Sequence, residues 1–200
     1  MSQPMSEQND VIGGKTALIA LGGNVTSTFG PPEMTLREAL SRLSNESLKL
    51  SQTSRFFETP AFPAGSGPDF VNAVARVETV LSPDALLKLM HEVEADLGRS
   101  RRTRWEARII DLDLIGYGDE VRPNIGVWSK WRDLALEDQQ VLAPDGLVLP
   151  HPRLQDRAFV LGPLCDVAPD WVHPVLKQSA AELFAALPEK DRADLRPLSG

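Results

Sequence analysis

The chain has 200 residues, of which 42% are hydrophobic and 24% charged, and its formal net charge is −7. This length corresponds to one domain that can bury a core without a disulfide or a structural metal, and the single cysteine favours a reducing compartment. The acidic balance argues against general nucleic-acid binding, and the sequence contains no run of 18 apolar residues that could cross a membrane.

Both ends of the chain read as tails around one folded unit. Residues 1–14 are polar and lack a basic segment followed by an apolar run, so they predict a disordered tail and not a signal peptide. We expect the folded domain over residues 15–187, with an insertion at about residues 119–146 and a loose tail over residues 188–200.

Between the tails, strand and helix signals alternate. Continuous or period-two apolar patterns predict four strands. These are residues 16–23, 48–59, 70–80 and 108–119. Helical spacing of apolar residues, with prolines near the first turn, predicts two long helices and three shorter helical stretches. The helical segments are residues 31–44, 82–98, 152–154, 158–165 and 179–187. The β-α-β-β-α-β order predicts an α+β fold with a ferredoxin-like core and additional C-terminal helices.

Two aspartates stand one residue apart in the last predicted strand. Because side chains alternate along a strand, Asp111 and Asp113 share one face, while Leu112 points to the other. Two like charges repel unless a cation lies between them, and magnesium is often held by one or two carboxylates together with substrate phosphates. The pair predicts a magnesium site, although a solvated strand face would show the same pattern.

An arginine-rich segment leads into the acidic pair. Five arginines and no lysine fall within ten residues: Arg99, Arg101, Arg102, Arg104 and Arg108. A guanidinium group grips phosphate oxygens in pairs, so a metal-bound triphosphate would suit this segment. Trp105 could stack on a base or serve as a packing anchor. A solvated basic loop, or a patch for nucleic acid, would explain the arginines taken alone.

A histidine between two prolines forms a second candidate. The flanking prolines fix the position of His151, which could donate to a phosphate or tune protonation; Arg157 and Phe159 follow in the next segment. A purely structural histidine is the alternative.

Two earlier segments suggest a pocket for a flat polar ligand. Thr59-Pro60 precedes Phe70-x-Asn72, in which the amide could pair with the edge of a heterocycle and the ring could cover its face. Phenylalanines at positions 70 and 159 would equally suit a hydrophobic core.

Together these segments resemble one family closely, hydroxymethyl-dihydropterin pyrophosphokinase. The matching stretches are ALIALGGN, SRFFETPAF, PDFVNAV, GRSRRTRWEARIIDLDLI and LVLPHPRLQDRAFVLGPL, and the resemblance spans about residues 16–187. It implies that diphosphate passes from ATP, the co-substrate, to the hydroxymethyl group of 6-hydroxymethyl-7,8-dihydropterin in folate biosynthesis. In this family the pterin hydroxyl attacks the β-phosphorus and AMP leaves.

The resemblance also implies roles for matching positions. Asp111 and Asp113 are expected to hold two Mg²⁺ ions and, with Arg99 and Arg108, to form the catalytic group. The expected ATP contacts are Arg99, Arg101, Arg104, Trp105, Arg108, His151 and Arg157. The expected pterin pocket is Thr59, Pro60, Phe62, Phe70, Asn72 and Phe159, with Phe70 and Phe159 stacking on the two faces of the ring. ATP and the pterin are the expected partners, with no nucleic acid and no membrane, and we expect a cytoplasmic monomer.

The chain departs from the family pattern in two informative places. Glu106 stands where a glycine is usual, which places a negative side chain near the expected phosphates. The insertion at about residues 119–146 is longer than in compact members, and we expect Trp128 and Trp131 to pack against the body of the protein. Neither departure removes the acidic pair or the arginines.

Two other functions remain compatible with parts of this pattern. Another magnesium-dependent transferase on a ferredoxin-like sheet, such as a nucleotidyltransferase, would share the acidic pair without needing the Asn72 pocket. An RNA-binding module would use exposed aromatic residues on a four-stranded sheet, but Asp111 and Asp113 would repel phosphate there unless a metal were present.

Overall fold

The computed structural model describes residues 14–61, 67–99, 108–135, 138 and 141–198. Its centre is an antiparallel sheet made of β1 (Lys15–Gly23), β2 (Leu48–Thr53), β3 (Phe57–Thr59), β4 (Phe70–Thr79), β5 (Asp111–Tyr117) and β6 (Arg196–Pro197). The strand order is β5-β1-β4-β3-β6, and β2 also pairs with β4. With one helix after β1 and another after β4, this is the ferredoxin-like arrangement, so the predicted fold is confirmed.

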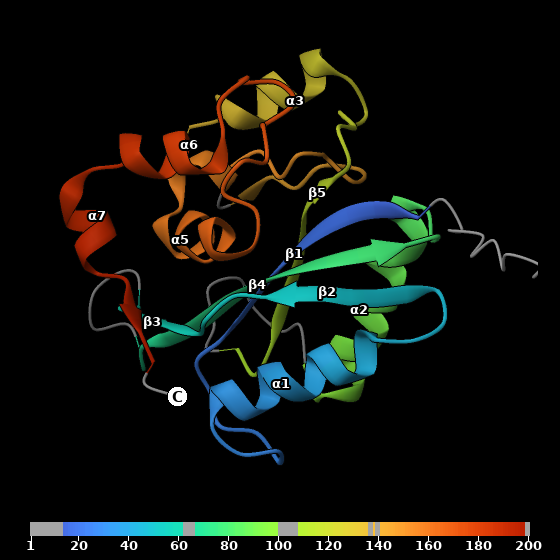
Figure 1. Cartoon of the computed structure of the whole chain (residues 1–200), viewed down its shortest axis with the longest axis vertical. Helices are drawn as coiled ribbons and strands as arrows, with labels where there is room; N and C mark the ends of the chain where they lie inside the picture. Colours follow the sequence, from blue (N-terminus) through green and yellow to red (C-terminus); the bar gives the residue numbers. More distant parts are fainter. Residues whose placement is uncertain (1–13, 62–66, 100–107, 136–137, 139–140, 199–200) are drawn as a thin grey trace, which may run out of the picture.

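Helices cover both faces of the sheet (Figure 1). One face packs against α1 (Pro32–Leu43) and α2 (Pro83–Asp96). The C-terminal layer on the other side contains α3 (Ile125–Arg132), η1 (Leu154–Asp156), α5 (Ala158–Val167), α6 (Ala180–Ala186) and α7 (Glu189–Ala193). Strand β1 serves both cores: Ile19 lies in the cluster with the α1 and α2 side chains, and Leu18 in the cluster with those of α5 and α6. Burial on both faces explains why this strand reads as an unbroken apolar run.

Local sequence signals fix the ends of the predicted helix that became α2. The Ser82 hydroxyl accepts a hydrogen bond from the Ala85 amide at 3.3 Å, and Pro83 occupies the first turn. Gly98 follows the helix with a φ of +92°, a left-handed conformation that glycine adopts readily. The helix therefore begins and ends within one or two residues of the prediction.

The predicted single strand over residues 48–59 is divided into β2 and β3. At the break, the Ser54 hydroxyl accepts the Val74 amide at 2.9 Å, a bond that a regular ladder would take to a carbonyl. The Arg55 amide turns away from the sheet to Asp166 of α5, at 3.1 Å from its Oδ2. A side chain from the helical layer thus interrupts the ladder, which local sequence patterns could not indicate.

The C-terminal region is more ordered than expected. The prediction of a loose tail over residues 188–200 differs from the structure, because α7 and β6 form there and β6 pairs with β3. In the insertion, Trp128 is fully buried and its indole N–H donates to the Pro150 carbonyl at 2.8 Å, as expected for a packing residue. None of the helices that the structure describes combines the length and the apolar character needed to cross a bilayer.

Candidate functional site

Strand β5 presents its two aspartates on the face covered by the C-terminal layer. In the antiparallel pairing with β1, Asp111 stands opposite Gly22 and Asp113 opposite Ala20, so both carboxylates share one face as predicted. Burial, reinforced by the charge of Asp113, raises the pKa of Asp111, and the nearby arginines oppose the rise. A position that makes a carboxylate costly to ionise is typical of functional sites and favours a bound cation.

Two arginines bind the first aspartate directly. The Arg99 Nη2 lies 2.7 Å from Oδ1 of Asp111, and Arg108 pairs with the other carboxylate oxygen. Arg99 also pairs with Glu94 of α2, whose carboxylate accepts the Leu112 amide at 2.7 Å. Both arginines are therefore placed beside the acidic pair, where their remaining N–H groups can face a bound phosphate.

Glu94 was missed in the sequence analysis. The residue is 1% exposed, and burial raises the pKa of its carboxyl group. A signal was available, because Glu94 falls four residues after Met90 on the buried stripe of α2, where a charged residue is rare unless it is paired. Glu94 links the β5 backbone to Arg99 and so holds that guanidinium in place.

Asn24 was also missed, and it joins three segments. The Asn24 side chain accepts the Arg108 amide at 2.7 Å and donates to the Pro68 carbonyl at 3.1 Å, while its own amide donates to the Arg108 carbonyl at 2.9 Å. These bonds hold the Arg108 backbone beside the end of β1, and the regular pairing of β5 begins at Asp111 and not at the predicted residue 108. A Cβ on Gly23 would lie 2.7 Å from the Ile109 carbonyl oxygen, so this close approach requires a glycine.

His151 and Arg157 approach the same charges from the C-terminal layer. Burial, reinforced by the charge of Arg157, lowers the pKa of His151 to about 3, so the imidazole is neutral at pH 7. Its Nδ1 accepts the Arg153 amide at 3.1 Å, which leaves the proton on Nε2 as a hydrogen-bond donor. Burial lowers the pKa of Arg157, and the charges of Asp113 and Asp111 oppose this, so Arg157 lies within electrostatic reach of the acidic pair.

The expected pterin residues lie two strands away on the same face. Gly22 pairs with Asp111 on one side and with Asn72 of β4 on the other, so these three positions form a row across the sheet. Two interstrand spacings make this row about 10 Å long. The Asn72 amide donates to the Thr59 hydroxyl at 2.8 Å, and its oxygen lies 3.0 Å from where a Cβ on Gly22 would stand. Glycine at position 22 leaves room for the amide at the sheet surface.

The two predicted stacking rings come from different layers. Phe70 is partly buried on β4, two residues before Asn72 and therefore on the same face. Phe159 is 39% exposed at the start of α5, and the Arg157 guanidinium lies 5.7 Å from its ring centre. Pro60 is exposed after β3. Four predicted contacts lie outside the described residues: Phe62, Arg101, Arg104 and Trp105.

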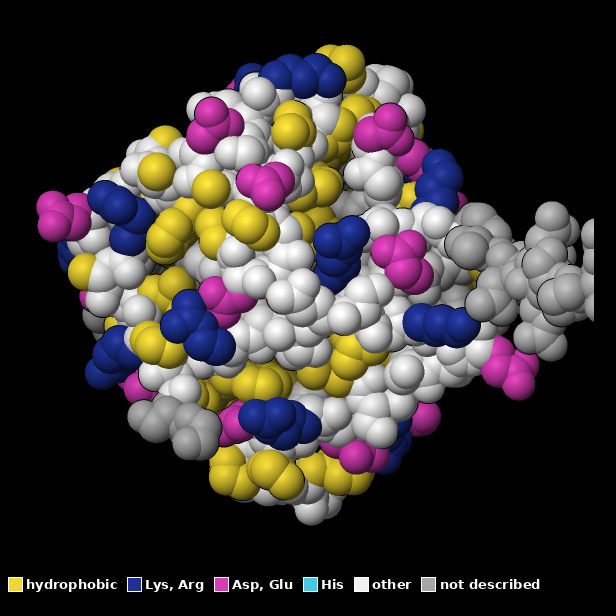
Figure 2. Space-filling view, viewed as in Figure 1, with side chains coloured by type: hydrophobic (Ala, Val, Ile, Leu, Met, Phe, Trp, Pro, Cys, Tyr) yellow, Lys and Arg dark blue, Asp and Glu magenta, His cyan; other side chains and the backbone are white. Residues whose placement is uncertain are grey.

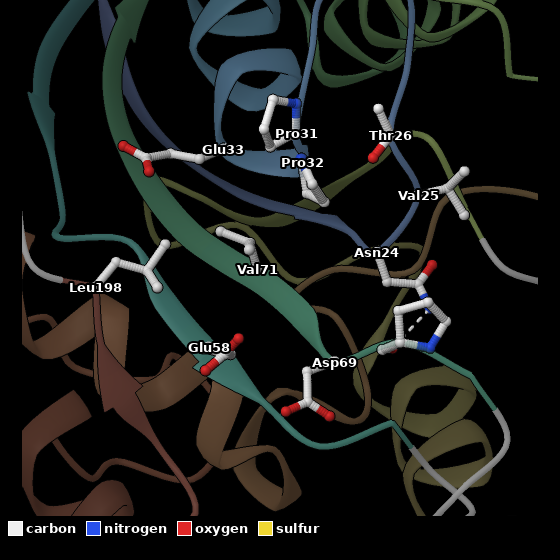
Figure 3. A pocket seen from close by; sticks show the side chains of 11 residues that line it. Asn24, Val25, Thr26, Pro31, Pro32, Glu33, Glu58, Asp69, Val71 and Leu198 are labelled. Atoms are coloured by element: carbon white, nitrogen blue, oxygen red, sulfur yellow. Dashed lines mark hydrogen bonds between the residues drawn. The ribbon is translucent and has the colours of Figure 1, made fainter.

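A cavity of about 610 Å³ lies elsewhere, on the opposite face of β4 (Figure 3). It includes Val71, whose side chain points away from the Asn72 face, and three carboxylates from Glu33, Glu58 and Asp69. Figure 3 shows the Asn24 side chain bonded to Pro68 at its edge. These carboxylates pair with Arg37 and Arg196, so the nearby cations are already engaged and this cavity does not suit ATP.

The acidic pair fits magnesium by the chemistry of its donors. Among the described residues, no group of three or more histidine, cysteine or acidic side chains is arranged to hold a metal. Two carboxylates are nevertheless a common protein contribution to a Mg²⁺ site, because water and substrate phosphates complete the octahedron. Asp111 and Asp113 match this donor set and have cationic groups on both sides.

Comparison with known proteins gives the family. The family model for 7,8-dihydro-6-hydroxymethylpterin-pyrophosphokinase matches residues 18–169. A 2-amino-4-hydroxy-6-hydroxymethyldihydropteridine pyrophosphokinase from Haemophilus influenzae is 36% identical over 159 residues, covering 80% of this chain and 85% of that protein. A folic acid synthesis protein, fol1, from Pneumocystis carinii is 30% identical over 186 residues, covering 93% of this chain but only 22% of that protein.

Solved structures agree on the fold. The HPPK-DHPS of Plasmodium falciparum, in a crystal structure with SDX-DHP, superposes with a TM-score of 0.58 at 17% identity. The match covers 86% of this chain and 43% of that one, so the present chain spans less than half of its structural neighbour. The family match over most of the chain, the Haemophilus relative and the shared fold lead to one conclusion: the chain belongs to the 7,8-dihydro-6-hydroxymethylpterin-pyrophosphokinase family.

Proposed function

We propose that this chain transfers the diphosphate group of ATP to the hydroxymethyl group of 6-hydroxymethyl-7,8-dihydropterin. The family and its curated relatives support the reaction. The row Asp111–Gly22–Asn72 supports the assignment of residues, since it separates an acidic, arginine-flanked end from an amide end by about 10 Å. A molecule with a heterocycle at one end and a hydroxyl near the phosphates at the other suits this row.

In the proposed reaction, the pterin hydroxyl oxygen bonds to the β-phosphorus of ATP while the bond from that phosphorus to the α,β-bridging oxygen breaks. AMP leaves with the bridging oxygen, and the hydroxyl proton is released. Magnesium, when bound at Asp111 and Asp113, would neutralise phosphate charge; we propose two ions. Little covalent work falls to the protein, so positioning and charge stabilisation are expected to dominate.

The protein groups divide the work as follows. Arg99, Arg108 and Arg157 are proposed to stabilise the negative charge of the phosphates, because all three lie next to the acidic pair. His151, which is neutral, is proposed to donate a hydrogen bond from Nε2 without adding charge. Asn72 is proposed to bind the polar edge of the pterin, with Thr59 orienting the amide.

The remaining contacts are proposed on the same basis. Phe70 and Phe159 would cover the two faces of the pterin, and Pro60 and Phe62 would complete its pocket. Arg101, Arg104 and Trp105 would add further ATP contacts. A monomer in the cytoplasm is our proposal for its state, and the single cysteine fits a reducing compartment.

A nucleic-acid function receives no support from the visible surface. On the face in Figure 2, lysine and arginine side chains alternate with aspartate and glutamate side chains, without the continuous basic stripe that nucleic acid requires.

The decisive experiment follows the products. The protein, Mg²⁺, ATP and the hydroxymethyl-dihydropterin are mixed, and nucleotides are separated by chromatography. We expect AMP and the pterin diphosphate in equal amounts. Release of free pyrophosphate with AMP attached to the acceptor would instead identify a nucleotidyltransferase, and AMP formation independent of the pterin would contradict the proposal.

A further inference from the structure

A second cavity lies at the other end of the same sheet face. Its volume is about 400 Å³, and its lining includes Leu18 of β1, Arg76 of β4, Gly118 after β5 and the segment from Val167 to Trp171. Arg76 is four residues along β4 from Asn72, which corresponds to about 13 Å. The cavity is therefore separate from the proposed pterin and phosphate positions.

The cavity is lined by a cation, the guanidinium group of Arg76, that has no partner among the residues the structure describes. Across the described residues, the Arg76 side chain forms no ion pair or hydrogen bond, and its Nε atom is buried without an acceptor. Glu78, two residues further along the same strand, accepts a hydrogen bond from the Thr16 hydroxyl at 2.8 Å and forms no ion pair with Arg76. A buried, unpaired guanidinium N–H is costly, because it has lost its hydrogen bonds to water and gained none.

Trp171 lines the same cavity, and its backbone and indole are both held in place. The Trp171 amide donates to the Ala168 carbonyl at 3.1 Å, and the Trp171 carbonyl accepts the Ala180 amide at 2.9 Å. The indole lies close to the sheet where β5 has a glycine, since a Cβ on Gly116 would be 3.3 Å from its Cζ2. The indole also contacts the edge of the His173 ring, with centroids 5.6 Å apart. This wall is preformed, so a ligand would not have to order it.

The surroundings define what the cavity can accept. The apolar part of the lining is Leu18, Val167, Ala168 and Pro169. Figure 2 shows further apolar side chains gathered over the C-terminal helices. Asp170 also lines the cavity and is acidic, so it disfavours a ligand with several negative charges such as a phosphate. A single negative charge on an apolar body meets both conditions.

We propose that this cavity binds a small monocarboxylate with a flat apolar body, whose carboxylate pairs with Arg76 and whose ring lies against Trp171 and Leu18. The site is independent of the transfer reaction, and binding there does not require the proposed function to be correct. An arginine–carboxylate pair supplies direction, and the apolar walls supply the remaining contact area.

The test uses benzoate as the probe and the full chain as the protein. Benzoate is titrated while the Trp171 indole N–H signal is followed by NMR, with saturating Mg²⁺ and ATP present so that the arginines near Asp111 are occupied. We expect a saturable shift of that signal, and at least tenfold weaker binding of benzyl alcohol, which has the same ring without the charge.

Matched variants locate the site. Arg76→Gln should weaken benzoate binding at least tenfold, whereas Lys49→Gln removes an exposed positive charge from the neighbouring strand and should leave it unchanged. Ala168→Leu keeps the arginine but fills the cavity, and it should also abolish the shift; it replaces Arg76→Gln if that variant does not fold. Equal benzoate affinity in all variants, equal affinity for benzyl alcohol, or no saturable shift would overturn the proposal.

Discussion

Two regions of the molecule treat their polar groups in opposite ways. Around Asp111, buried charges are paired: the carboxylate meets Arg99 and Arg108, and Glu94 accepts the Leu112 amide. Around α3, burial is dominated by rings: Trp128 is fully buried, and its centroid lies 5.3 Å from that of His173. The first region concentrates charge that a substrate could use, while the second supplies packing. Activity and stability should therefore be separable by mutation.

The largest effect is expected from a substitution in the packing region around α3. Replacing Trp128 with alanine removes a fully buried indole and its hydrogen bond to Pro150, so the free energy of unfolding should fall by about 3–5 kcal/mol. Activity per folded molecule should stay nearly unchanged. Chemical denaturation and AMP production on the same samples measure both. Trp131→Ala, on the same helix but only partly buried, is the control, and an equal loss from both variants would contradict the role of burial.

The next largest effect is expected from substitutions in the charged region around Asp111. Asp111→Asn and Asp113→Asn keep the side-chain shape but remove the charge, and each should lower kcat/KM more than about 100-fold, the upper end for residues that only support a metal ligand. Thermal melting should show a folded protein. Asp119→Asn, an exposed acid after the same strand, should retain full activity. Full activity in either of the first two variants would refute the metal role.

A pH titration sharpens the comparison within the packing region. Burial lowers the pKa of His173 to about 4, below the ordinary value of 6.5, so the unfolded state binds the proton first as pH falls. The contribution of His173 to the free energy of unfolding is therefore fully present above about pH 6.5 and decreases as the pH falls to about 4. Between pH 7 and pH 5 the loss is roughly 2 kcal/mol.

The His173→Asn variant isolates this contribution. The asparagine oxygen can replace Nδ1 as acceptor for the Val175 and Leu176 amides, now at 3.2 and 3.1 Å, but it does not titrate. Denaturation curves at pH 7 and pH 5 should show a smaller loss of stability in the variant than in the parent. An identical pH dependence would mean that His173 is not the group responsible.

The sequence predicted what local patterns encode. The apolar run before Gly22, the spacing of Asp111 and Asp113, and the cap at Ser82 led to the correct strands, shared face and helix start. It did not predict interactions between distant segments. The bond from Arg55 to Asp166 lies where the predicted strand is split, and the bonds of Asn24 join the Arg108 backbone to the end of β1. Such effects depend on tertiary contacts, which override local propensity.

The same distinction applies to the site. The residues proposed to contact substrate have chemical types and spacings that resemble a family pattern, so they could be proposed from the sequence. Glu94 and Asn24 act through other residues, and their partners lie 5 to 84 positions away in the chain. Only the folded arrangement shows that they hold Arg99 and the Arg108 backbone. Support of this kind is the part of a site that sequence patterns describe least well.

The smallest expected effect distinguishes the two ends of the row that runs from Asp111 to Asn72. Asn72 lies about 10 Å from Asp111 across β1, so its amide should recognise the pterin and not the phosphates. Asn72→Ala should weaken pterin binding about tenfold, the loss of one or two hydrogen bonds, while ATP affinity changes little. Calorimetry with each ligand measures this directly. Thr59→Val removes only the hydroxyl that orients the amide and should have a smaller effect in the same direction. If Asn72→Ala weakened ATP binding more than pterin binding, the two ends of the row would have to be exchanged.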